Sequence, residues 1–154
     1  MEFILAVKPY AQLSLVVALV VLAWKTGAGP EKASALTLFC QAPADWLYHF
    51  AAGSGTIWYQ IDIGHTIIDL VTTASFIIIA IHANRLYTIF LASLQIIALS
   101  SHIIMILSDE IAALSYSIIS ISPSYLQIVV LGVGIFLHLK RKSTCGPYPS
   151  WINL

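Results

Sequence analysis

Long apolar stretches, separated by short polar ones, dominate the hydrophobic pattern of this sequence. A helix that crosses the roughly 30 Å apolar core of a bilayer needs about 20 residues at about 1.5 Å each. Four stretches reach that length with few or no charges, at residues 3–24, 62–82, 86–107 and 111–137. The pattern therefore predicts an all-α integral membrane protein.

The stretch at residues 33–52 leaves the number of spans open, because it combines apolar residues with Pro43 and Asp45. It is either a fifth, polar-bearing span or an external loop with an interfacial helix, which would leave four spans. The predicted turns at residues 83–85 and 108–110 are so short that neighbouring helices must run antiparallel. We predict one domain, an antiparallel bundle of five transmembrane helices, with four as the alternative. The predicted spans are residues 3–24, 33–52, 62–82, 86–107 and 123–139.

The last apolar stretch is too long for a single span, since residues 111–138 would form a helix of about 42 Å. Ser122 and Pro123 together resemble a helix start, because Ser is a preferred N-cap and Pro is favoured at the first helical position. Either the last helix starts at Pro123, after a separate interfacial helix at residues 111–121, or one long helix kinks there. Residues 140–154 are expected to form a basic tail.

The composition agrees with a membrane protein. Apolar residues make up 59% of the chain and charged residues only 9%, whereas a soluble domain carries about 25% charged residues. Seven basic and seven acidic residues cannot cover the surface of a compact soluble protein. The composition therefore argues against a soluble domain, a disordered chain and a nucleic-acid-binding protein.

The positive-inside rule, by which cytoplasmic loops are enriched in Lys and Arg, favours five spans over four. With five spans only Lys8 lies outside, whereas with four spans Lys25 and Lys32 do. The C-terminus is then cytoplasmic and the N-terminus outside, as expected for a protein of a bacterial inner membrane. The basic residues that share the inner side in the five-span arrangement are Lys25, Lys32, Arg85, Lys140, Arg141 and Lys142.

Ionisable residues inside a span are costly, so they are candidates for a functional site. The five-span arrangement puts His49, His65 and His102 at similar depths near the outer ends of their helices. Such histidines can bind a haem or a metal ion, and we predict a cofactor site at these three residues. The metal, if one binds, is not specified by any ligand spacing.

Three aspartates accompany the histidines and are predicted to form a polar network with them. Asp45 and His49 are four residues apart, as are His65 and Asp69, so each pair shares a helix face. Asp62 lies three residues before His65. The same layer also suits a proton or quinone site, or a set of hydrogen bonds that only holds the helices together.

No motif in the sequence identifies a reaction, and no catalytic residue is predicted. The small size predicts a non-catalytic accessory or structural subunit of a larger membrane complex, respiratory or photosynthetic. One alternative is a haem- or metal-binding electron-transfer or quinone anchor protein, and another is a small membrane enzyme or proton-coupled carrier. Expected partners are the lipid bilayer, with lipid bound to the protein, and other membrane subunits or further copies of the chain.

Overall fold

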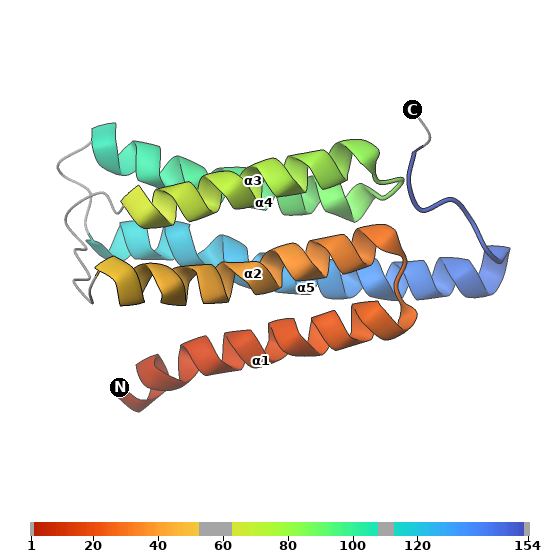
Figure 1. The fold of residues 1–154 in the computed structure, drawn as a ribbon, viewed down its shortest axis with the longest axis horizontal. Helices are drawn as coiled ribbons and strands as arrows, with labels where there is room; N and C mark the ends of the chain where they lie inside the picture. The colour runs from red at the N-terminus through yellow and green to blue at the C-terminus, as the bar shows by residue number, and fades with distance from the viewer. Residues whose placement is uncertain (1, 53–62, 108–112, 153–154) are drawn as a thin grey trace.

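A computed structural model describes residues 2–52, 63–107 and 113–152, and these residues form five helices (Figure 1). The helices are α1 (Glu2–Thr26), α2 (Gly29–Ala52), α3 (Ile63–His82), α4 (Leu86–Leu107) and α5 (Ala113–Cys145). The predicted all-α helical bundle is confirmed. Asp62, one of the predicted site residues, lies outside the described residues.

The helices lie side by side in a bundle (Figure 1), and each helix packs against the next one in sequence. α4 lies between α3 and α5, and α5 also contacts α1 and α2. The α1–α2 turn, the α3–α4 turn and the C-terminus share one end of the bundle (Figure 1), which we call the tail end. The end of α2 and the starts of α3 and α5 share the opposite end.

α2 begins at Gly29, four residues before the predicted span, and local chemistry explains the earlier start. Pro30 occupies the first turn, where its missing N–H costs no helical hydrogen bond. The Oε2 atom of Glu31 accepts a hydrogen bond of 3.0 Å from the backbone N–H of Ala28. This bond, from an acid at the third helical position back to the N-cap residue, is one half of a capping box, since Ala28 has no side-chain acceptor for the other half.

α5 is one continuous helix of 33 residues that contains Pro123. Of the two arrangements predicted for this stretch, the single long helix therefore holds, and the helix start at Pro123 with a separate helix at residues 111–121 is wrong. A proline removes one helical hydrogen bond and favours a bend, and the helix continues on both sides of this one. At about 1.5 Å per residue, α5 is about 50 Å long, and its C-terminal part projects beyond the other helices (Figure 1). Lys140, Arg141 and Lys142 therefore belong to α5 and not to a separate tail.

Two helical segments of the described chain are long and apolar enough to cross a membrane, Ile63–His82 and Ser122–Cys145. Shorter apolar segments lie at Tyr10–Thr26 and Leu86–His102. This assignment depends only on the length and composition of each helix, and the buried core helix of a soluble protein can meet the same criterion. Two of the five predicted spans thus correspond to helical segments that are able to cross a membrane.

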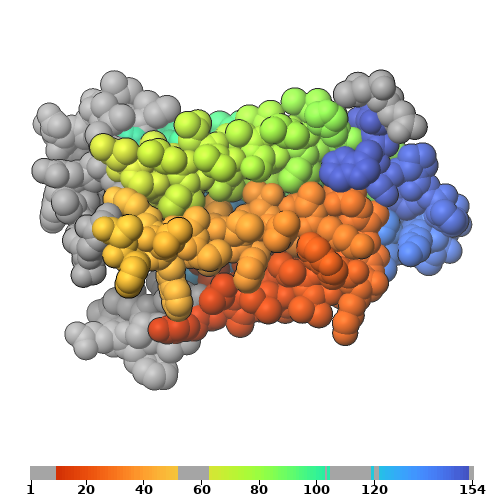
Figure 2. Space-filling view, in the orientation of Figure 1, coloured from red at the N-terminus to blue at the C-terminus, as the bar shows by residue number. Residues whose placement is uncertain are grey.

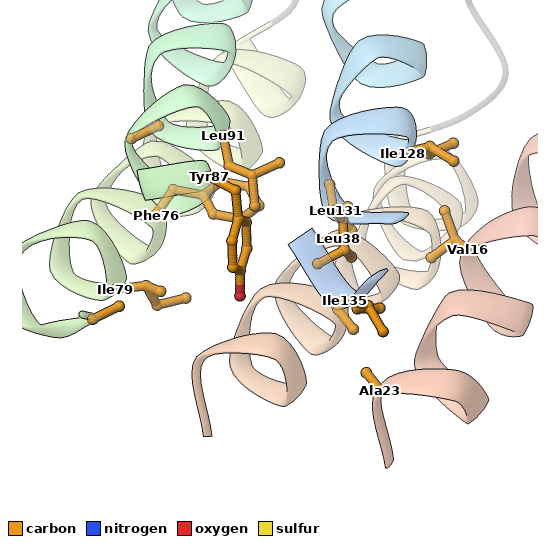
Figure 3. Packing of buried hydrophobic residues seen from close by; sticks show 13 residues of the cluster. Val16, Ala23, Leu38, Phe76, Ile79, Tyr87, Leu91, Ile128, Leu131 and Ile135 are labelled. Carbon is orange, nitrogen blue, oxygen red and sulfur yellow. The ribbon is translucent and has the colours of Figure 1, made fainter. Parts of the chain in front are cut away.

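Apolar side chains from all five helices meet in one cluster, part of which Figure 3 shows. Phe76 of α3, Leu91 of α4, and Leu131 and Ile135 of α5 are each fully buried in it. Val16 and Ala23 bring α1 into the same cluster. Among the residues whose side chains the structure describes, this cluster lies nearer the tail end, and there it joins all five helices.

The close packing of α5 on α4 depends on Gly134. A Cβ atom at this position would lie 2.6 Å from Cγ of the buried Tyr87 ring, whereas one at Gly132 would meet its nearest neighbour, Leu19, at an ordinary 3.7 Å. We expect Gly134→Ala to destabilise the bundle by about 1–3 kcal/mol through overpacking. Gly132→Ala, the matched control, should be neutral or stabilising by up to about 1 kcal/mol because Ala favours the helix.

The measurement is the free energy of unfolding of both variants in detergent micelles, followed by helical circular dichroism. Equal effects of the two substitutions would contradict the packing of Tyr87 on Gly134.

Candidate functional site

At the opposite end of the bundle, α2 and α3 bring one aspartate and two histidines together. The Nε2 atom of His65 lies 2.6 Å from Oδ1 of Asp45, and Nε2 of His49 lies 3.6 Å from the same oxygen. One potential ligand atom from each residue lies within 4.8 Å of the other two. The side chains are 29–40% exposed, so they remain accessible from outside the bundle. We call Asp45, His49 and His65 the Asp–His–His cluster.

Local structure positions the cluster. Asp45 and His49 are one helical turn apart on α2, and so they face the same way. The Tyr48 ring packs beside both imidazoles, with centroid distances of 5.4 Å to His49 and 5.5 Å to His65. Its ring also occupies the space that a Cβ atom at Gly64 would need. The small residue at the start of α3 therefore allows the two helices to approach closely enough for His65 to reach Asp45.

A second polar group lies between α3, α4 and α5, with its Asp69 side chain 23% exposed. Oδ2 of Asp69 is 3.0 Å from Nε2 of His102, and Oδ1 of Asp69 accepts a hydrogen bond of 2.9 Å from the Gln95 amide. Oε1 of Gln95 in turn accepts a bond of 2.8 Å from the amide of Gln127. Gln95 and Gln127 are each 1% exposed, and His102 is 5% exposed. We call Asp69, His102, Gln95 and Gln127 the buried polar chain.

The two groups show how the predicted layer is arranged. The described structure brings His49 and His65 together with Asp45, and it pairs His102 with Asp69. Both close pairs, His65 with Asp45 and His102 with Asp69, join different helices. Spacing along the chain had instead paired His65 with Asp69 on α3. Helix packing, and not the i,i+4 spacing, thus sets these partners.

A third ionic contact lies at the tail end, where Arg85 of the α3–α4 turn reaches Glu31 of α2. The Arg85 Nε atom donates to Oε1 of Glu31 at 3.0 Å, and the two side chains are only 6% and 0% exposed. The other carboxylate oxygen of Glu31 accepts the capping bond from Ala28. Glu31 thus caps α2 and also fastens it to the α3–α4 turn.

The C-terminal segment, residues 146–152, folds back onto the tail end of the bundle (Figure 2), where the Arg85 guanidinium donates to the Pro149 carbonyl at 3.4 Å. Gly146 has a φ of 73°, which a glycine adopts without strain, and it reverses the chain at the end of α5. The backbone N–H of Asn84 donates to the Ser150 carbonyl at 3.2 Å, and that of Ile152 donates to the His82 carbonyl at 2.7 Å. The segment is therefore bonded to the α3–α4 turn as a short antiparallel bridge.

Tyr148 anchors the C-terminal segment. The guanidinium carbons of Arg85 and Arg141 lie 4.5 Å and 4.2 Å from the centroid of its ring. Its hydroxyl is 2.8 Å from Nδ1 of His138 on α5. Each cation–π contact stabilises by about 0.5–1 kcal/mol at an exposed position, so the ring connects α5, the α3–α4 turn and the segment itself.

We expect Tyr148→Ala to destabilise the protein by about 2 kcal/mol, since it removes two cation–π contacts and one hydrogen bond. Tyr148→Phe keeps the ring and should cost only about 1 kcal/mol. Hydrogen exchange of the Asn84 and Ile152 amides, which bond the segment to the turn, should accelerate strongly in Tyr148→Ala alone. Unchanged exchange in that variant would show that the segment docks without its tyrosine.

The sequence-based prediction missed several of these polar residues. Gln95 and Gln127 are uncharged, so the positions of the ionisable residues in the apolar stretches do not point to them. Arg85 enters the sequence analysis only as a basic residue of the inner side, and nothing in the sequence singles out Glu31 as its partner. A search for every hydrogen-bonding side chain within the apolar stretches would have found the two glutamines, whereas nothing in the sequence links Tyr148 to Arg85.

The chain shows no match to a protein-family model, to a curated protein or to a solved structure. The interpretation of its sites therefore depends on the residues themselves.

Proposed function

We propose that this chain is an integral membrane protein of five spans that serves as a non-catalytic subunit of a larger membrane complex. The observation that carries the proposal is the apolar outer surface of the described bundle, which accompanies several buried polar side chains in its interior. Buried positions include Gln95, Gln127 and Thr88, whereas large apolar residues lie on the outside. Exposed apolar residues of three helices are Ile67, Leu70, Val71, Ile78 and Ile81 on α3, Ile89, Phe90, Ile96 and Ile97 on α4, and Leu126, Val129, Val133 and Phe136 on α5.

This distribution supports a membrane location because soluble proteins rarely expose apolar patches larger than a few hundred Å². Lipid or partner helices could cover such a surface, because its apolar side chains have no polar group that would be left without a hydrogen bond. The polar side chains inside the bundle agree with membrane helices, in which polar residues face the interior and bond one another.

Five spans are supported by the position of α2. This helix packs against α1, α3 and α5, as a member of the bundle would and an external loop would not. Its 24 residues correspond to about 36 Å, enough to cross the apolar core. The six basic residues of the predicted inner side all lie at or near the helix ends that meet at the tail end. We therefore propose that this end is cytoplasmic.

Cysteine labelling tests this topology. Lys25 is exposed near the end of α1, and it lies inside with five spans but outside with four. In a Cys40→Ser, Cys145→Ser background, Lys25→Cys should resist a membrane-impermeant maleimide applied to bacterial spheroplasts and react after permeabilisation. The native Cys145, kept alone by Cys40→Ser, is the matched inner-side control. Labelling of Lys25→Cys from outside, with Cys145 shielded, would establish four spans.

The role as a subunit is supported by the outward face of α5. Leu126, Val129, Val133 and Phe136 are spaced three and four residues apart, so they form one apolar stripe on the helix. A continuous stripe of this kind suits packing against another transmembrane helix. Among the described residues there is also no domain outside the bundle that could hold a separate active site.

Purification at native expression level in a mild detergent, with identification of every chain present in fixed stoichiometry, tests this role. We expect one or more membrane partners. Val133→Trp should weaken their association, because it adds bulk to the α5 stripe while remaining apolar, and Ile97→Trp on α4 is the control. A chain that purifies alone as a monodisperse species would overturn the proposal.

A second candidate function, proton transfer or quinone binding, is favoured by the buried polar chain. Asp69 and His102 are a carboxylate and an imidazole in contact, and two buried amides extend the connection to α5. Such groups relay protons in membrane proteins. Asp69→Asn retains the shape without the charge, so a loss of cellular function at unchanged protein level would support this role, and an unchanged phenotype would exclude it.

A further inference from the structure

We propose that Asp45, His49 and His65 bind a divalent transition-metal ion of the Zn²⁺ class at the opposite end of the bundle, between α2 and α3. The three side chains offer two imidazole nitrogens and one carboxylate oxygen, all within 4.8 Å of one another. The inference does not depend on the subunit role, since it concerns the chain alone.

The geometry suits this ion after only small side-chain rotations. Zn²⁺ binds imidazole nitrogen and carboxylate oxygen at about 2.0–2.2 Å in a tetrahedron, so its ligand atoms stand about 3.4 Å apart. Here Nε2 of His49 is 3.6 Å from Oδ1 of Asp45, and Nε2 of His65 is closer, at 2.6 Å. The ion would take the place of the direct contact between His65 and Asp45, and the imidazole would move outward by less than 1 Å.

The ligand types select the class of ion. Imidazole suits Zn²⁺, Cu²⁺, Ni²⁺ and Fe²⁺, whereas Mg²⁺ and Ca²⁺ prefer sites made only of oxygen atoms. Three protein ligands leave a tetrahedral ion with one open position, unlike the closed four-ligand sites that are purely structural. Because the three side chains are partly exposed, an ion can enter and leave. The site is therefore suited to reversible metal binding, with water or a further ligand in the open position.

The packing around the cluster makes it more than a chance grouping. The imidazoles of His49 and His65 stand with their centroids 5.1 Å apart, and the Tyr48 ring lies beside both of them. The ring limits the directions in which the imidazoles can turn. The ligands come from two helices, so a bound ion would fasten the end of α2 to the start of α3.

Metal titration of the full chain tests the site. The protein is purified in detergent with an affinity tag that lacks histidine, stripped with a chelator, and titrated with Zn²⁺ and separately with Co²⁺. We expect one equivalent to bind, with the intense visible absorption of tetrahedral Co²⁺, and the thermal stability to rise on binding. His49→Asn, His65→Asn and Asp45→Asn should each weaken binding by about 100-fold or more, since loss of an outer partner alone costs about 10–100-fold.

The matched control is His82→Asn, which removes an exposed histidine at the far end of α3 and should leave the affinity unchanged. Circular dichroism and the thermal stability of each metal-free variant show that the fold is intact, and Asp45→Asn, which changes only the charge, is the mildest of the three. Absence of stoichiometric binding by the wild type would overturn the proposal. So would binding that persists unchanged in the three ligand variants.

Discussion

Replacing Arg85 with methionine is expected to destabilise the folded bundle by about 3–5 kcal/mol, because it leaves the carboxylate of Glu31 buried without its partner. Glu31 is fully buried and bonded to Arg85 at 3.0 Å. A buried ion pair contributes modestly to net stability, but removal of one member leaves an uncompensated charge in a medium of low polarity. This is a large share of the 5–15 kcal/mol that stabilises a typical domain.

Two further variants separate the ion pair from the other contacts of Arg85, which also stacks on Tyr148. Glu31→Gln removes only the acid and should likewise be strongly destabilising. The double variant Glu31→Leu, Arg85→Met should recover much of the loss, since it leaves no unpaired charge. The free energy of unfolding in micelles is measured for each, with Lys140→Met as the exposed control, which should stay within about 0.5 kcal/mol. If Arg85→Met lowers the free energy of unfolding by no more than Lys140→Met does, the ion pair is screened by water and the prediction is contradicted.

Asp69→Ala is expected to produce the second large effect, a loss of about 2–5 kcal/mol in the free energy of unfolding. Two buried donors, on His102 and Gln95, approach the carboxylate at 3.0 Å and 2.9 Å. Each would lose its acceptor, and an unsatisfied buried donor costs about 1–3 kcal/mol. The effect should spread to α5, because Gln95 also accepts the bond from Gln127.

Asp69→Asn separates shape from charge in the same experiment. The amide oxygen can still accept a bond from Gln95, and the amide nitrogen can donate to a neutral His102 whose proton has moved to the other ring nitrogen. We therefore expect this variant to be less destabilising than Asp69→Ala. Ser75→Ala on the outward side of α3 is the control, since its hydroxyl bonds only within its own helix in the described contacts. A loss in Asp69→Ala equal to that of Ser75→Ala would contradict the buried polar chain.

Much of the fold could be predicted from sequence because hydrophobic length and local signals act within one segment. Among the described residues, α3 (Ile63–His82) and α4 (Leu86–Leu107) occupy the predicted stretches 62–82 and 86–107. The errors occurred where local signals conflict with neighbouring structure. Ser122 and Pro123 resemble a helix start, yet α5 passes through them, because a long helix loses only one hydrogen bond at a proline and retains all its other contacts.

The candidate site was only partly predictable, for a related reason. Spacing along α2 correctly places Asp45 and His49 on one face, since both belong to the same helix. It cannot give the partner of His65, because that depends on the rotation and depth of α3 relative to α2. Tyr48 packed on Gly64 sets that relation, and no periodic pattern in the sequence describes such a contact.

The sequence by itself determined the all-helical class, the positions of α3 and α4 and the gathering of basic residues at one end, since these follow from hydrophobic length, short turns and chain order. Only the tertiary structure decided which polar residues meet. Packing paired His65 with Asp45, His102 with Asp69 and Arg85 with Glu31. It also bonded residues 150–152 to the α3–α4 turn. The physical reason is that the sequence shows which buried side chains require a hydrogen-bonding or ionic partner. The identity of that partner depends on which helix packs beside them.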